Sequence, residues 1–141
     1  MIIRKIDKEL SKRLKERRFK IGHCYSNSFK VFNENKDKNI ECWVIGYCKH
    51  KDDFRAFRHG WNLNKDGEIV DVTLVDEKLD NYEYYEAFKF TLDEFNESDA
   101  MEKTTGYALI GFDIDSELKC IKKNNLYVVE EDLLGFIYPY I

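Results

Sequence analysis

The chain has 141 residues, a length that suits one domain and is sufficient to bury a sizeable core. Its composition, 43% hydrophobic and 35% charged with 15% aromatic residues, excludes an intrinsically disordered, collagen-like or linker-like chain. The net charge of −4 argues against a surface dominated by nucleic-acid binding, and no apolar run approaches the roughly 20 residues that a membrane span requires.

The first residues and the cysteines together predict a cellular location. The first residues lack the apolar stretch and the cleavage site of a secretory signal, so we expect a cytoplasmic protein. In that compartment the four cysteines are expected to be reduced thiols. Three of them, Cys42, Cys48 and Cys120, are expected to be small buried hydrophobic residues.

The first predicted element is a helix that carries a strong positive charge. Ile6, Leu10 and Leu14 recur at intervals of four residues, and Asp7 is suited to cap the start of the helix. Residues 1–20 contain nine Lys and Arg and three Asp and Glu, a net charge of +6, and the rest of the chain carries −10. We interpret this charge as a solvated helix face, and the alternative is a segment that binds nucleic acid or an acidic surface.

The middle of the chain is predicted to form a second helix followed by strands. The helix begins near Cys24 and places Tyr25, Phe29 and Phe32 on one face. Stretches rich in β-branched and aromatic residues predict strands over residues 40–48, 54–63, 68–74 and 84–90. Together these elements indicate an α+β fold, formed as one domain from residues 1–141.

The last third of the chain is predicted to contain further helices and a strand. Thr91 and Glu94 have the spacing of a capping box at the start of a helix. Residues 107–112 are apolar and predict a buried strand, and Ser116 is expected to cap a later helix.

Three separated segments contain the residue types that thiol chemistry requires. Cys24 opens the second helix, His59 lies in the second predicted strand, and Asp71 lies in the third. The partial positive charge at a helix N-terminus and a nearby imidazolium both favour the reactive thiolate. A carboxylate on the other ring nitrogen fixes the imidazole tautomer and stabilises its charge. Backbone N–H groups at the helix start are suited to hold a developing oxyanion.

The turn between the second and third strands decides whether Asp71 reaches His59. A three-residue turn over residues 65–67, ending in a glycine suited to the left-handed conformation, places Asp71 opposite Trp61. Asp71 then shares a sheet face with His59, one diagonal away and within reach of a hydrogen bond. A turn of two or four residues would send Asp71 to the other face, and Asn62 is the weaker alternative for the third member.

This pattern resembles the core of transglutaminase-like and papain-like enzymes of the cysteine hydrolase superfamily. In the transglutaminase-like group a Gly-x-Cys segment opens a helix, and a His-Ala-Trp strand and an Asp-Pro-Thr strand follow. The matching segments here are Gly22-His23-Cys24, His59-Gly60-Trp61 and Asp71-Val72-Thr73, within roughly residues 20–75. The resemblance implies a Cys-bearing helix packed on an antiparallel sheet, with Cys24 as nucleophile, His59 as base and Asp71 as the residue that orients His59.

The resemblance also implies a class of reaction and a kind of substrate. The reaction is acyl transfer from an amide of a protein or peptide, by hydrolysis of a peptide or isopeptide bond, deamidation or transamidation. Trp61, Tyr25 and Asn62 are expected to contact this substrate. The alternative is a binding module of the same fold that sequesters a protein or a small ligand without turnover.

The expected chemistry requires neither a cofactor nor a metal ion. Cys42, Cys48, His50 and His59 are potential ligands, but the spacing of the first three is not that of a zinc knuckle or finger. Nucleic acid and membranes are not expected partners, and nothing in the sequence selects an oligomeric state.

Overall fold

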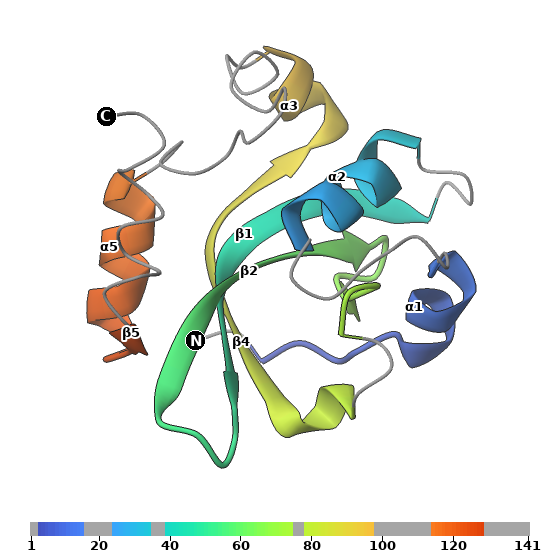
Figure 1. Ribbon diagram of the computed structural model, residues 1–141. Coiled ribbons are helices and arrows are strands. Elements are labelled where there is room, and N and C mark those ends of the chain that lie inside the picture. The colour runs from blue at the N-terminus through green and yellow to red at the C-terminus, as the bar shows by residue number, and fades with distance from the viewer. Residues whose placement is uncertain (1–2, 16–23, 35–38, 75–77, 98–113, 129–141) are drawn as a thin grey trace.

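The structure, a computed structural model, describes residues 3–15, 24–34, 39–74, 78–97 and 114–128. Within these segments the chain forms a curled antiparallel sheet with helices packed around it (Figure 1). The expected α+β class is therefore confirmed. The strand expected over residues 107–112 lies outside the described residues.

The sheet is built around two long neighbouring strands. The strand order is β3-β2-β1-β4, with antiparallel pairing throughout, and a short strand β5 pairs in parallel with β2. The strands are β1 (Ile40–His50), β2 (Arg55–Asn64), β3 (Ile69–Val70), β4 (Tyr82–Thr91) and β5 (Tyr127–Val128). Residues 43–48 of β1 and 59–64 of β2 bury side chains on both faces of the sheet, as the β-branched and aromatic composition of these strands predicts.

A bulge in β4 bends the centre of the sheet. The register between β1 and β4 shifts after Ile45, so that Gly46 pairs with Glu86. A Cβ atom at Gly46 would lie only 2.0 Å from the carbonyl oxygen of Tyr85 and 3.0 Å from the ring of Trp61. Because only glycine permits this close approach, Gly46 fixes where β4 curves around β1.

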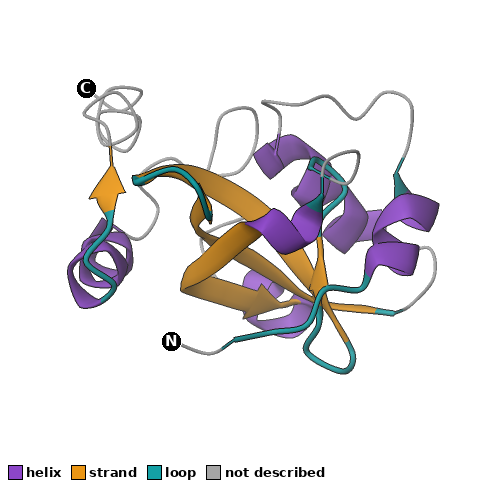
Figure 2. Cartoon of the chain, turned by 90° about the horizontal axis from the view of Figure 1, so that it is seen from below, coloured by secondary structure: helices purple, strands orange, loops and turns teal. Residues whose placement is uncertain are grey.

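The helices are α1 (Lys8–Leu14), α2 (Cys24–Glu34), α3 (Leu92–Glu97) and α5 (Ile114–Lys123), and a 3₁₀ turn, η1, spans Leu79–Asn81. Figures 1 and 2 show α5 well apart from α1 and α2. Arg58 and Asn62 lie on the same face of β2 and bond to α5 and α2 respectively, so both helices cover this face at different ends of the sheet. Among the described residues, no helix combines the length and the apolar character needed to cross a membrane.

Two of the predicted helix starts are confirmed, and one is wrong. Asp7 caps α1 by accepting a hydrogen bond of 2.9 Å from the N–H of Leu10. Thr91 and Glu94 form the reciprocal bonds of a capping box, 3.1 and 3.2 Å long, at the start of α3. Ser116 lies inside α5 rather than at its cap, because the helix already begins at residue 114.

The core is divided between the two faces of the sheet. On the face covered by α1 and α2, the apolar cluster contains Leu10, Val31, Phe32, Trp43 and Ile45. On the other face, the cluster contains Val44, Cys48, Trp61, Leu63, Leu74, Leu79 and Tyr84. Cys48 and Cys120 are buried as expected, but Cys42 is only half-buried.

Candidate functional site

The hairpin that joins β2 to β3 has the predicted register. Its turn ends at Gly67, which adopts the left-handed conformation with φ of 77°, and Asn62 pairs with Val70. This register brings the next residue, Asp71, to the face of the sheet that carries His59. The strand expected over residues 68–74 is nevertheless shorter, because the chain turns away from the sheet directly after Val70.

His59 and Asp71 form a buried pair. The Nε2 atom of His59 lies 2.7 Å from Oδ2 of Asp71, and the two residues are only 2% and 1% exposed. The hydroxyl of Tyr84 donates a second hydrogen bond of 2.8 Å to the same oxygen. The backbone N–H groups of Thr73 and Leu74 both donate to Oδ1 at 3.0 Å. The carboxylate thus receives four hydrogen bonds, which fix its orientation and stabilise its negative charge.

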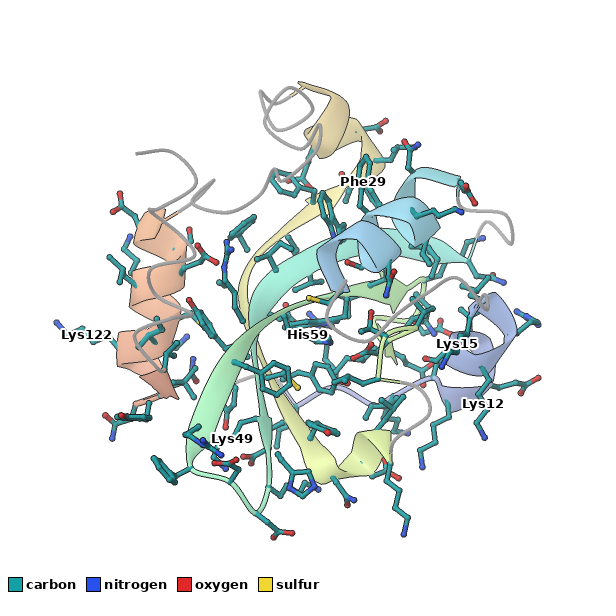
Figure 3. The ribbon with its side chains drawn as sticks, in the orientation of Figure 1. Lys12, Lys15, Phe29, Lys49, His59 and Lys122 are labelled. Carbon is teal, nitrogen blue, oxygen red and sulfur yellow. The ribbon has the colours of Figure 1, made fainter. Side chains whose placement is uncertain are left out.

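Cys24 completes the arrangement from the first turn of α2. Cys24 is half-buried, and its sulfur forms a hydrogen bond with His59. The sulfur also attracts the positive charge of the His59 ring. Since Nε2 of the imidazole is engaged by Asp71, Nδ1 is the ring nitrogen left for the thiol. In the view of Figure 3, His59 lies near the centre of the molecule, below α2. The structure therefore brings Cys24, His59 and Asp71 together.

The charges of this cluster perturb the protonation of its members. Burial alone lowers the pKa of His59, but attraction to Asp71 and to Cys24, with hydrogen bonds to both, raises it to about 10. Burial alone raises the pKa of Asp71, but attraction to His59 and the hydrogen bonds of the carboxylate lower it below its usual value. His59 is therefore an imidazolium and Asp71 a carboxylate at neutral pH.

The remaining cysteines have a different environment. Burial raises the pKa of Cys42, raises that of Cys48 well above the usual value and raises that of Cys120 to about 11. Each of these three thiols is thereby kept in its protonated, unreactive form at neutral pH. Among the described residues, no group of three or more His, Cys, Asp or Glu side chains is arranged to hold a metal ion.

Hydrogen bonds attach the first turns of α2 to neighbouring segments of the chain. The side-chain amide of Asn27 donates to the hydroxyl of Thr73 at 2.9 Å, which joins α2 to the segment that follows Asp71. The hydroxyl of Ser28 donates to the carbonyl oxygen of Cys24 at 2.5 Å and accepts from the indole N–H of Trp43 at 2.9 Å. These contacts fix the position and orientation of the first turn of α2, which carries the Cys24 thiol.

Two of the three residues expected to contact the substrate are buried in the core. Trp61 is fully buried, and its ring stacks on His59 at a centroid distance of 5.9 Å. Asn62 is also fully buried, and its amide donates to the carbonyl oxygen of Ser28 at 3.0 Å. Both residues therefore support the site from inside the core instead of presenting a surface to a substrate. The side chain of Tyr25 lies outside the described part of the structure.

Sequence reasoning missed the hydrogen-bond partners that surround the central pair. Asn27 carried a usable signal, because a position three residues after Cys24 lies on the same side of a helix. Tyr84 carried no comparable signal, since its approach to Asp71 depends on the pairing and the bulge of β4.

The basic N-terminal segment is partly neutralised within the molecule. Arg4 forms an ion pair with Glu86, and Lys8 forms one with Asp80. Figure 3 shows Lys12 and Lys15 at the periphery of the molecule, away from His59. The charges of Arg4, Lys8, Lys12 and Lys15 are therefore separate from the Cys24–His59–Asp71 cluster, and residues 16–20 lie outside the described part of the structure.

Comparisons with known proteins identify no relative of this chain. A scan against protein-family models, a search of curated proteins and a search of solved structures each find no match. The chemistry of the cluster is therefore inferred from its own geometry.

Proposed function

We propose that the protein is a cysteine-dependent acyl-transfer enzyme that acts on an amide of a protein or peptide. The proposal rests on the observation that His59 bonds to Asp71 through Nε2 and has the Cys24 thiol as its other partner. The thiol is partly exposed, whereas the imidazole and the carboxylate are buried. An arrangement of this kind presents a nucleophile to solvent while it holds the base in one orientation.

We further propose that the fold has a papain-like, transglutaminase-like core. In support, Cys24 is the first residue of α2, His59 lies on β2, and Asp71 directly follows β3. The helix packs against β1 and β2 of the antiparallel sheet, with Phe29 of α2 against Trp43 of β1. The order of the three residues along the chain also matches that resemblance.

In the first step of the proposed reaction, the sulfur of the Cys24 thiolate bonds to the carbonyl carbon of the amide. The carbonyl π electrons move to oxygen, and backbone N–H groups at the start of α2 stabilise the resulting oxyanion. As the tetrahedral intermediate collapses, the C–N bond breaks and the His59 imidazolium gives its proton to the leaving nitrogen. The product is a thioester between Cys24 and the acyl group.

In the second step, water or an amine attacks the thioester while neutral His59 accepts the proton of this nucleophile. The C–S bond breaks, and Cys24 leaves as the thiolate beside the regenerated imidazolium. Asp71 stays ionised throughout, because its four hydrogen bonds stabilise the charged form and lower its pKa. Water as the nucleophile gives hydrolysis or deamidation, and an amine gives transamidation.

Site-resolved labelling of the four cysteines tests this proposal. We expect iodoacetamide near pH 6 to modify Cys24 much faster than Cys120, since a thiolate reacts and a protonated thiol does not. An activated acyl ester should then form a thioester at Cys24, detected in the corresponding peptide by mass spectrometry. The Cys24→Ser variant removes the thiol, and Cys120→Ser is the matched control that should react like the unmodified protein.

The two readouts separate enzyme from binding module. Fast alkylation together with acylation of Cys24 supports acyl transfer. Fast alkylation without any acylation favours a non-catalytic module of the same fold. If Cys24 is alkylated no faster than Cys120, the proposed nucleophile is wrong.

A further inference from the structure

We infer that Tyr84 is a positioning residue of the candidate site, acting on His59 through the carboxylate of Asp71. This inference rests on the proposed function and adds a fourth side chain, from β4, to the three that the sequence predicts. Tyr84 comes from a strand that does not neighbour β2, since β1 lies between β2 and β4, yet its side chain reaches Asp71.

The hydroxyl of Tyr84 shares one carboxylate oxygen with His59. It donates to Oδ2 of Asp71 at 2.8 Å, and His59 Nε2 lies 2.7 Å from the same atom. The other oxygen is held by two backbone N–H groups. Tyr84 is therefore the side chain other than His59 that fixes Oδ2, the oxygen on which the orientation of the imidazole depends.

The ring of Tyr84 is itself held in place by aromatic packing. It meets Trp61 edge-on, with centroids 5.1 Å apart and an interplanar angle of 70°, and Trp61 stacks on His59. The residue is only 8% exposed. Burial, followed by the charge of Asp71, raises the pKa of Tyr84 well above its usual value. The hydroxyl therefore keeps its proton and remains a donor over the pH range in which a thiol enzyme works.

Loss of the Tyr84 hydroxyl is expected to change the acidic side of the pH profile of Cys24 alkylation. The Tyr84 hydrogen bond is one of the interactions that lower the pKa of Asp71, so its removal raises that pKa. Asp71 orients and charges His59 only while it is ionised. Raising the pKa of Asp71 therefore moves the loss of Cys24 reactivity, which accompanies acidification, to a higher pH.

The Tyr84→Phe variant tests this, because it keeps the ring and its packing and removes only the hydroxyl. We expect the acidic limb of the Cys24 alkylation profile to move to higher pH by roughly one pH unit, the effect of one hydrogen bond to a charged group. Near pH 8 the rates of the variant and the unmodified protein should converge. Tyr85→Phe is the matched control, because Tyr85 is the next residue of β4 and its hydroxyl bonds to Glu83 instead; its profile should not shift.

A double-mutant cycle tests whether Tyr84 acts through Asp71. In the Asp71→Asn background, the further change Tyr84→Phe should have no additional effect on the pH profile, since the carboxylate is already absent. An equal loss at every pH, or a full additional loss in the Asp71→Asn background, would show a purely structural role and overturn the inference. An unshifted Tyr84→Phe profile beside fast Cys24 alkylation would overturn it too, while leaving the proposed function intact. Slow Cys24 alkylation in the unmodified protein would instead reject the proposed function.

Discussion

Two neighbouring residues of β2, Arg58 and His59, each hold a buried carboxylate. Arg58 Nε lies 2.6 Å from Oε1 of Glu117 in α5, and His59 Nε2 lies 2.7 Å from Oδ2 of Asp71. Since successive side chains of a strand point to opposite faces, the two pairs occupy opposite sides of the sheet. They are similar in length and burial, but they differ in what the cation can do.

The difference between the two pairs lies in proton exchange. A guanidinium remains charged at all relevant pH values and offers no proton to a reaction. An imidazole exchanges its proton, and His59 has a thiol on the side away from its carboxylate. Burial of an ion pair therefore does not mark a functional site by itself. The third partner, Cys24, distinguishes the His59–Asp71 pair from the pair that anchors α5.

Removing the imidazole should have the largest effect on reactivity. We expect His59→Gln to lower the rate of acyl transfer to Cys24 by roughly 10²- to 10⁴-fold, the usual contribution of a general acid and base. Glutamine retains a donor for Asp71, so circular dichroism should show the fold preserved. A variant that acylates at the original rate would remove His59 from the mechanism.

Removing the guanidinium should act on stability instead. Arg58→Met takes away the cation that faces the buried carboxylate of Glu117, and we expect the free energy of unfolding to fall by roughly 3–5 kcal/mol. Denaturant titration measures this loss, and the second change Glu117→Leu should restore most of it. Below the unfolding transition, the pH profile of Cys24 alkylation should match that of the unmodified protein. A displaced profile would show that the two pairs are coupled.

The pH dependence of stability should also separate the two pairs. The pKa of His59 is raised from 6.5 to about 10 in the folded protein. Its stabilising contribution is therefore fully present below about pH 6.5 and is lost as the pH rises through about 10. We expect the free energy of unfolding to fall by on the order of a few kcal/mol over this window. This fall in the free energy of unfolding with rising pH should disappear in His59→Gln and persist in Arg58→Met. The opposite pattern would contradict the assignment of the pH dependence to His59.

The smallest expected effect comes from the bond between α2 and the segment after Asp71. Asn27→Ala removes the hydrogen bond to Thr73, and we expect a loss of about 1–2 kcal/mol in the free energy of unfolding. Cys24 alkylation should slow as well, because the helix start is no longer fixed relative to Asp71. Slower alkylation without any loss of stability, or the reverse, would show that this bond does not couple position to reactivity.

The parts of the site that the sequence predicts are those set by local rules. The three-residue turn ending at Gly67 fixes the register of its hairpin, so the proximity of Asp71 to His59 follows from turn chemistry. The helix near Cys24 follows from the spacing of Tyr25, Phe29 and Phe32. Both depend on residues close to one another in the chain.

The parts that could not be predicted depend on distant packing. The third strand stops at Val70 because Asp71 bonds to the N–H groups of Thr73 and Leu74, which turns the chain away from the sheet. Trp61 is buried rather than open to a substrate because its ring packs against both His59 and Tyr84. The contact of Tyr84 with Asp71 requires the β4 bulge, whose position relative to β2 no local pattern of the sequence specifies.

Titration of the His59 ring by NMR tests the central claim most directly. With the ring nitrogens labelled, we expect the imidazolium to persist across neutral pH and to lose its proton only at about pH 10. The Cys24→Ser variant, which removes the sulfur that attracts the charge of His59, should lower this midpoint. An imidazole that titrates near pH 6.5, unchanged in Cys24→Ser, would show that thiol, imidazole and carboxylate do not act as one unit.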